Sequence, residues 1–136
     1  MKILIDTNIL LDVALNRPAF VAASARVLDW AELNPGQAAV AWHSVANVSY
    51  LLKQDARGFL TDLLAIVEIA AGDTATVRQA LAMPTRDFED ALQVAAAITF
   101  GADLIVTRDI ADFRKLPIAA VTPARFVSDY MTDAPE

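Results

Sequence analysis

Apolar and polar residues alternate along the chain in blocks that predict alternating strands and helices. Short, mostly apolar runs are typical of strands buried on both faces of a sheet, and such runs lie at residues 3–5, 38–42, 66–70, 104–107 and 119–121. Between these runs, apolar residues recur at three- and four-residue spacings, which is the period of an amphipathic helix. This alternation predicts an α/β fold with a parallel sheet covered by helices on both faces.

Residues that start or stop helices set the limits of the predicted helices. Ser44 and Asp87 are well placed to cap helix N-termini, and Gly101 is well placed to end a helix. Helices are predicted at residues 8–15, 20–31, 44–52, 58–64, 74–81 and 87–98, and from Pro123 onward. The chain has no internal repeat, low-complexity tract or linker, so residues 1–136 are expected to form a single domain.

The composition narrows the possible chemistry. Apolar residues make up 56% of the chain, which is enough for a packed core. No apolar run approaches the ~20 residues of a membrane span and no secretory signal opens the chain, so we expect a cytoplasmic protein. The absence of Cys excludes disulfides, thiolate metal sites and a Cys nucleophile. The single His, His43, excludes a zinc site built from several His, and it is either a packed structural residue or part of a site rim.

The charge of the chain is acidic and unevenly distributed. A net charge of −6 argues against a protein that coats nucleic acid, since phosphate binding normally needs a basic surface. Five acids crowd a 26-residue stretch: Asp87, Glu89, Asp90, Asp109 and Asp112. Bound divalent cations would cancel much of this local charge and reverse the sign that a phosphate meets.

Several of the acids stand where predicted strands end. Asp6 directly follows the first strand, and Asp109 lies two residues past Thr107. Asp87 and Asp90 are one helical turn apart at a helix start. Ligands of parallel α/β sheets bind beyond the carboxyl ends of the strands, and Mg²⁺ and Mn²⁺ prefer carboxylate oxygens. The pattern indicates a site in which a metal generates hydroxide from water, so no side-chain nucleophile is needed.

Each acid also has a structural interpretation. Asp87 and Asp90 could be a helix cap and a first-turn acid, and Asp6 could cap the first helix. Asp109 and Asp112 could be ordinary loop acids. The metal-site interpretation gains weight because three separate segments bring acids to one predicted rim, where aspartates following buried strands are costly unless paired or metal-bound.

Polar neighbours of these acids are further candidates. Thr7 and Asn8 could orient the first acid or a bound water, and Thr107 could hydrogen-bond a site carboxylate. Each of the three is equally well explained as a turn residue. Arg108 and Arg114 could hold an RNA phosphate, or they could form surface salt bridges.

Three segments of the chain together resemble the signature blocks of PIN domains. These segments are "MKILIDTNILLD" at the start, "DFEDALQVAAA" from Asp87 and "GADLIVTRDIADF" from Gly101, followed by "VTPARF" at 121–126. The likeness is to small prokaryotic PIN proteins such as the VapC-type toxins. It implies a three-layer α/β/α sandwich with a central parallel sheet, and Mg²⁺- or Mn²⁺-dependent cleavage of single-stranded RNA by metal-activated water. It also implies a homodimer and, for the toxin group, an antitoxin partner.

The resemblance assigns roles to individual acids. Asp6 matches the first acid of the family, Asp90 the third and Asp109 the fourth. Asp112 matches an auxiliary acid, and Asp87 is placed as an outer ligand one turn before the third acid.

One position departs from the family pattern. Many PIN nucleases carry a Glu on the helix after the second strand, and Asn47 occupies that place here. Ser44 and Asn47 keep the spacing of a capping box, in which Glu would be usual. An Asn can still offer an oxygen but brings no charge, which implies weaker metal binding or a single ion.

Two other functions compete with a nuclease. A PIN-like fold that has lost efficient catalysis would act by binding RNA or a partner, and Asn47 is the feature in its favour. A receiver-like phosphoryl-transfer domain would use Asp6 as acceptor together with a late Lys. The only late Lys is Lys115, beside Arg114 in a predicted loop, which disfavours this alternative.

Overall fold

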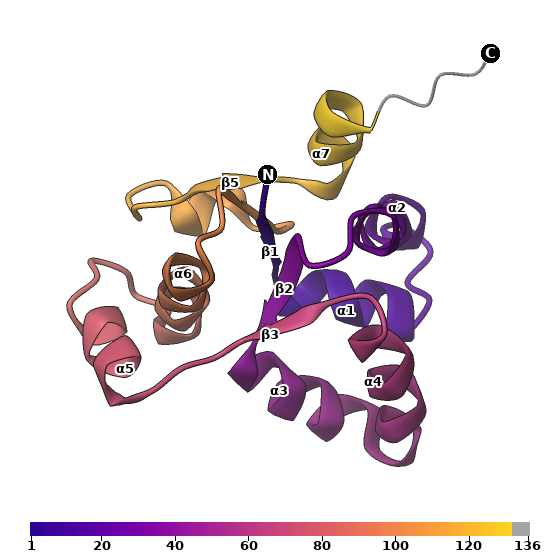
Figure 1. Cartoon of the computed structure of the whole chain (residues 1–136), viewed down its shortest axis with the longest axis horizontal. Coiled ribbons are helices and arrows are strands. Elements are labelled where there is room, and N and C mark those ends of the chain that lie inside the picture. The colour runs from indigo at the N-terminus through magenta and orange to yellow at the C-terminus, as the bar shows by residue number, and fades with distance from the viewer. Residues whose placement is uncertain (132–136) are drawn as a thin grey trace.

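The computed structural model describes residues 1–131 and contains a five-stranded sheet between helices (Figure 1). The strands are β1 (Ile3–Ile5), β2 (Ala38–Ala41), β3 (Glu68–Ala70), β4 (Leu104–Val106) and β5 (Ala119–Val121). They lie in the order β3-β2-β1-β4-β5, and every neighbouring pair is parallel. The predicted α/β fold with a central parallel sheet is therefore confirmed.

Helices cover both faces of the sheet. They are α1 (Thr7–Ala14), α2 (Val21–Leu33), α3 (Trp42–Leu52), α4 (Ala56–Leu64), α5 (Thr74–Leu81), α6 (Phe88–Phe100) and α7 (Pro123–Tyr130), with 3₁₀ turns η1 (Lys53–Asp55) and η2 (Ile110–Phe113). Neighbouring side chains of a strand point to opposite faces. Ile3 and Ile5 accordingly pack with residues of α1 to α4 and α7, while Leu4 packs with residues of α6. The result is a three-layer α/β/α sandwich.

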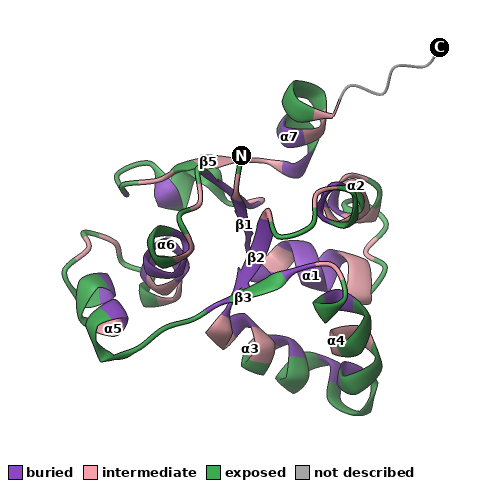
Figure 2. Cartoon of the chain, viewed as in Figure 1, coloured by how far each residue is buried: buried purple, intermediate pink, exposed green. Residues whose placement is uncertain are grey.

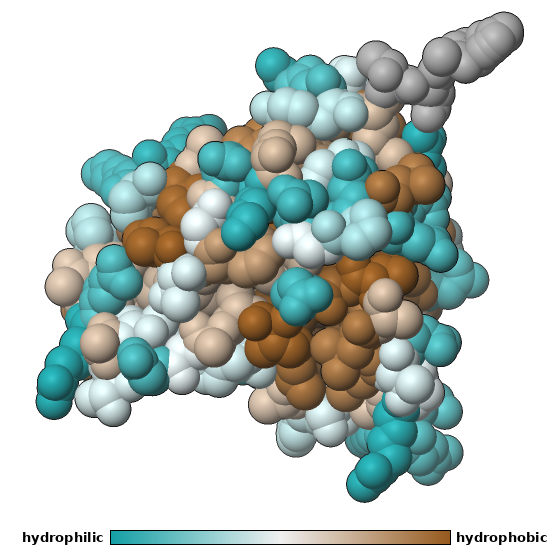
Figure 3. Space-filling model, viewed as in Figure 1, coloured by the Kyte–Doolittle hydropathy of each residue, from teal (hydrophilic) through white to brown (hydrophobic). Residues whose placement is uncertain are grey.

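Burial follows this layering, because the three inner strands β1, β2 and β4 are buried, while the edge strands β3 and β5 and the outer faces of the helices are partly exposed (Figure 2). Apolar surface gathers over β3 and α4, where Ile69 and Leu64 are exposed (Figure 3). Within residues 1–131 no helix combines the length and the apolar character that crossing a membrane requires.

Several predicted helix limits are confirmed by side-chain contacts. Asp87 caps α6 by accepting from the backbone N–H of Glu89, and Gly101 ends α6 in the left-handed conformation at φ 80°. Pro123 occupies the first turn of α7. Asp6 caps α1 by accepting from the N–H of Thr7, so its structural interpretation is also correct. A capping role leaves the second carboxylate oxygen available for other partners.

The predicted role of Ser44 is wrong. α3 begins at Trp42, directly after β2, and its N-cap is Ala41 without a side-chain hydrogen bond. Ser44 is therefore already inside the helix, where it is buried and its hydroxyl lies 2.7 Å from that of Thr7. The capping-box interpretation of Ser44 and Asn47 fails for the same reason. β2 runs into α3 without a loop, so no residue between them is left to act as a side-chain cap.

Candidate metal centre

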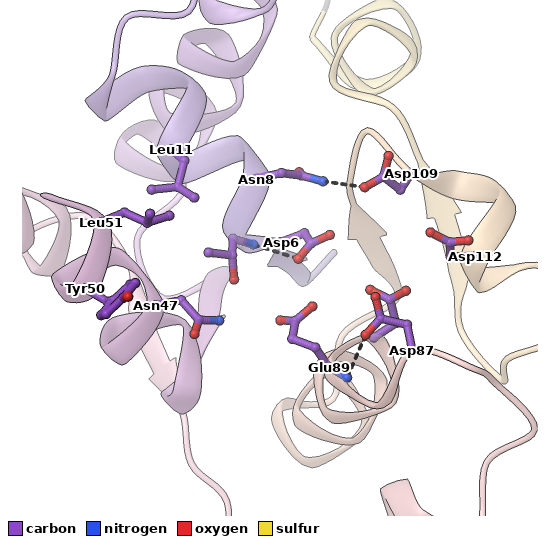
Figure 4. Close-up of a pocket in the computed structure, with 12 residues that line it drawn as sticks. Asp6, Asn8, Leu11, Asn47, Tyr50, Leu51, Asp87, Glu89, Asp109 and Asp112 are labelled. Carbon is purple, nitrogen blue, oxygen red and sulfur yellow. Dashed lines mark hydrogen bonds between the residues drawn. The ribbon is translucent and has the colours of Figure 1, made fainter.

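An acidic cavity of about 440 Å³ opens where β1 and β4 end, between α1, α3 and α6 (Figure 4). β1 is the central strand. The chain passes from it to β2 and β3 on one side, and then crosses back to β4 and β5 on the other. This is a topological switch point, where the loops and helix starts diverge and leave room for a ligand. The residues that line the cavity are Asp6, Thr7, Asn8, Leu11, Asn47, Tyr50, Leu51, Asp87, Glu89, Asp90, Asp109 and Asp112.

The acids that sequence analysis selected thus line one cavity and come from three segments: the β1–α1 junction, the start of α6 and the segment after β4. Asp6 and Asp90 are buried, whereas Asp87, Asp109 and Asp112 are exposed. The cavity therefore has buried carboxylates in its wall and exposed ones at its rim. No Lys or Arg lines it.

Asp6 is fixed at the junction of β1 and α1. Its Oδ2 accepts a 2.7 Å hydrogen bond from the Thr107 hydroxyl, and its Oδ1 accepts one of 2.7 Å from the backbone N–H of Thr7. Burial raises the pKa of Asp6 to about 6, and the charges of Glu89 and Asp109 add to this, although the two hydrogen bonds oppose it. The carboxylate is thus positioned by neutral donors, and no Lys or Arg of residues 1–131 pairs with it.

Asp90 lies in the first turn of α6 and is only 5% exposed. Its Oδ2 is buried without a hydrogen-bond partner among the described residues. Burial raises the pKa of Asp90 to about 7, and the charges of Asp87 and Asp6 add to the shift. A buried carboxylate oxygen with no donor is costly, so a missing positive partner is expected at this position.

Asp109 and its neighbours form the side of the cavity at the end of β4. The Asn8 amide donates to Asp109 Oδ2 at 3.2 Å, and the Thr107 hydroxyl accepts from the Asp109 backbone N–H at 3.1 Å. Asn8 therefore orients Asp109 and not Asp6. The hydroxyl of Thr7 contacts Ser44 and the Gln93 amide, and it makes no hydrogen bond to Asp6 or Asp109 among the described residues.

Glu89 also lines the cavity, and the sequence analysis did not select it as a site residue. Its Oε2 lies 2.8 Å from His43 Nε2 and accepts from the Gln93 amide at 2.8 Å. Burial opposes the charge, but the hydrogen bonds from His43 and Gln93 outweigh it and hold the pKa of Glu89 below its ordinary value. The sequence carries one signal of this arrangement, because Glu89 and Gln93 are four apart on a helix. His43 is 46 residues away and shows none.

The two candidate RNA-binding arginines lie outside the cavity. The Arg108 guanidinium donates to both carboxylate oxygens of Asp12, at 2.8 and 3.1 Å, and stacks 3.9 Å from the Phe20 ring centre. The salt-bridge interpretation of Arg108 is thus the one that the structure shows. Arg114 is exposed and lines a separate hollow beyond η2.

The residues present fit a divalent cation. The available donors are carboxylate and amide oxygens, which hard cations prefer. One oxygen from each of Asp87, Glu89 and Asp90 lies within 4.8 Å of the other two. The unpartnered Oδ2 of Asp90 adds a position at which a positive ligand is missing.

The fold and this acidic site define an α/β/α protein with a candidate metal centre at the switch point of its sheet. Residues 2–111 match the PIN domain family, and the chain belongs to that family. The predicted resemblance is therefore confirmed. No curated protein sequence matches the chain.

Solved structures similar to this chain include VapBC2 from Rickettsia felis bound to a DNA fragment from its promoter, with 18% identity and a TM-score of 0.69 over 90% of this chain and 98% of that one. A toxin–antitoxin complex from Klebsiella pneumoniae shares 22% identity with a TM-score of 0.69 over the same shares. VapC20 from Mycobacterium tuberculosis, described as a sarcin–ricin loop cleaving toxin, shares 16% identity with a TM-score of 0.57 over 76% of this chain and 87% of that one. At these identities the likeness shows the fold.

Proposed function

We propose that this protein is a metal-dependent endoribonuclease that cleaves single-stranded RNA, and that it is the toxin of a toxin–antitoxin pair. The observation that carries the proposal is the meeting of Asp6, Asp90 and Asp109 in one cavity that no Lys or Arg lines. Membership of the PIN-domain family and the likeness to toxin structures point in the same direction.

The proposed metal ligands fall into an inner group and an outer group at the edge of the cavity. Asp6, Asp90 and Asp109 would hold Mg²⁺ or Mn²⁺, with Asp87, Asp112 and the Asn47 amide oxygen at the edge. The bound ion would polarise the phosphodiester and lower the pKa of a bound water. Thr107 and Asn8 keep Asp6 and Asp109 in place through hydrogen bonds that do not depend on the ion.

Electrostatics require that the ion and the RNA bind together. The rim acids would repel a phosphate, so the ion must supply the attraction that a basic surface provides elsewhere. Tyr50, which is 81% exposed on α3, offers a ring on which a base can stack beside the cavity. The exposed Arg114 remains a candidate for a more distant phosphate.

A toxin of this kind has protein partners. Structures similar to this chain include VapBC and FitAB complexes, which supports an antitoxin as partner. The apolar surface over β3 and α4 is suited to a homodimer or to an antitoxin, since interface cores are more apolar than ordinary surface. We also propose that the protein acts in the cytoplasm, where its RNA substrate would be found.

The function is tested with purified protein and an unstructured RNA labelled at its 5′ end. We expect cleavage with Mg²⁺ or Mn²⁺, none with EDTA, and none of the same RNA hybridised to its complement. Asp90→Asn should abolish cleavage, whereas Asp62→Asn, an exposed aspartate on α4 outside the cavity, should not. Cleavage that persists in EDTA would overturn the proposal.

A binding module is the second candidate, and the neutral Asn47 in the cavity favours it. Retention of RNA by the metal-loaded protein without any cleavage would establish that function instead.

A further inference from the structure

Asn47 leaves the cavity wall formed by α3 without a charge. Opposite it, α6 contributes an acid that the family pattern does not assign: the Glu89 carboxylate points toward the Asn47 amide across the cavity (Figure 4). We propose that Glu89 is a metal ligand that takes the place of the acid missing at position 47, and that His43 and Gln93 position it. This inference rests on the proposed metal-dependent function.

The carboxylate of Glu89 is held by one oxygen only. The hydrogen bonds from His43 and Gln93 both reach Oε2, at 2.8 Å each, which leaves Oε1 for a cation. His43 comes from the start of α3 and Gln93 from the next turn of α6. His43 on α3, the helix that carries Asn47 in place of an acid, thus orients Glu89 on α6.

Gln93 is fully buried and is itself held by other elements. Its amide nitrogen lies 3.1 Å from the Thr7 hydroxyl and 3.0 Å from the Ser44 hydroxyl. The amide nitrogen of Gln93 therefore makes its contacts, whereas the amide oxygen is buried without a hydrogen-bond partner among the described residues. The network ties α1, α3 and α6 together immediately behind Glu89, so the carboxylate is fixed before any ligand arrives, as a preorganised site requires.

A cation explains why these acids stand together. Oxygens of Asp87, Glu89 and Asp90 gather within 4.8 Å of one another, and Asp90 Oδ2 is buried without a partner. A simple His–Glu pair would account for Glu89 alone. It would not account for the unpartnered oxygen on the adjacent residue.

The test is calorimetric binding of Mn²⁺ alone, without RNA, to the full chain. Glu89→Gln should weaken Mn²⁺ binding about tenfold or more, while Glu68→Gln, on exposed strand β3, should leave it unchanged. The sharper arm is a double-mutant cycle. Asn47→Glu should restore most of the affinity lost in Glu89→Gln, yet add much less affinity to the wild type, where Glu89 already fills the role.

Positioning by His43 is tested separately. His43→Gln keeps a donor that reaches Glu89 and should retain near wild-type affinity, whereas His43→Leu should lower it. Thermal melting of each variant without metal checks that the fold survives.

The outcomes separate this inference from the proposed function. If Glu89→Gln binds Mn²⁺ like the wild type while Asp6→Asn does not, Glu89 is no ligand and the metal-dependent function stands. If the wild type itself binds no Mn²⁺, both proposals fall. If Asn47→Glu adds the same affinity with and without Glu89, the replacement is refuted.

Discussion

Asp6 caps the N-terminus of α1 and Asp12 lies in the second turn of the same helix, and both are buried, at 4% and 0% exposure. Asp12 meets two cations and a hydroxyl: it accepts from Arg108 at 2.8 and 3.1 Å, from Arg17 at 3.3 Å and from Ser24 at 3.1 Å. Asp6 accepts two hydrogen bonds from neutral groups and pairs with no protein cation in the part of the chain that the structure describes. Two equally buried aspartates therefore differ in their partners: arginines balance the charge of Asp12, whereas only neutral donors contact Asp6.

This contrast separates a structural acid from a candidate functional one better than burial or residue type does. A buried carboxylate that protein cations satisfy has no use for a ligand, while one that only neutral donors orient is ready to bind a positive ion. Asp12 ties the segment after β4 to α1 and α2 through Arg108 and Ser24. Asp6 links the start of α1 to the end of β4, but only through neutral donors, Thr7 and Thr107.

The largest expected effect is the loss of RNA cleavage when Asp6, the candidate functional acid of this comparison, is replaced. Asp6→Asn should lower RNA cleavage on the order of a thousandfold, because it removes a charged ligand from the site. Its Mn²⁺ affinity should fall in parallel. The measurement is single-turnover cleavage of an unstructured RNA at saturating protein. Asp12→Asn, assayed at a temperature at which it is folded, should cut at a rate near that of the wild type, and equal losses in both variants would erase the distinction.

The same substitution at Asp12, the structural acid, is expected to lower the stability of the fold. Asp12→Asn should destabilise the fold by about 3 kcal/mol, since it leaves the part-buried Arg108 and Arg17 without a counter-charge. Metal-free Asp6→Asn should be as stable as the wild type or more so. Urea denaturation in EDTA measures both. A larger loss for Asp6→Asn than for Asp12→Asn would contradict the comparison.

The pH dependence of the stability of the metal-free protein tests whether Asp6 and Asp90 lack a balancing charge. The folded-state pKa of Asp6, about 6, and that of Asp90, about 7, both lie above the ordinary 3.8. The folded chain therefore binds these protons more tightly than the unfolded chain does, so both groups stabilise most below about pH 4 and this stability is lost as pH rises to about 7. Since each pKa unit is worth about 1.4 kcal/mol, we expect a fall of several kcal/mol across that window in EDTA and a much smaller fall with Mg²⁺.

Urea midpoints from pH 4 to pH 8 provide the measurement. Asp90→Asn should reduce the slope in EDTA, whereas Asp62→Asn should not. A metal-free stability that rose through this range would mean that the two carboxylates are satisfied in a way that the contacts do not reveal.

The smallest effect concerns a neutral group that orients Asp6. Thr107→Val removes the hydroxyl that donates to Asp6 and accepts from the Asp109 N–H, and it should cost about 1 kcal/mol. Without that donor the pKa of Asp6 rises further, so the pH profile of cleavage should move upward. Thr107→Ser keeps the hydroxyl and should leave the profile in place. Identical shifts in the two variants would assign the effect to packing.

The parts of this protein that are local in sequence were predictable. The strands are recognisable in the sequence as short apolar runs. Asp87 and Gly101 mark the ends of α6, because helix capping depends on residues only a few positions apart. The rim acids were predictable for a related reason, since parallel strands place their carboxyl ends at one edge whatever the details of packing.

What sequence analysis missed depends on contacts between distant residues. The pairing of His43 with Glu89 and of Arg108 with Asp12 spans 46 and 96 residues, and no spacing rule reaches that far. Ser44 was misjudged because its hydroxyl is used across the fold and not along the helix. Arg108 illustrates the cost: beside the acids in sequence it looked like a ligand for phosphate, while in space it neutralises a different aspartate.

The direct passage of β1 into α1 at Asp6 has a consequence for how the protein can change over time. One side chain ends the strand, caps the helix and faces the cavity, with no spacer residue between these duties. A single residue inserted there would turn α1 by about 100° relative to the sheet, moving Asn8 and Asp12 away from their partners at once. Insertions or deletions at this β1–α1 junction are therefore not expected to be tolerated. Adaptation to new substrates is expected at exposed residues of the cavity such as Tyr50, which can be exchanged without disturbing this junction.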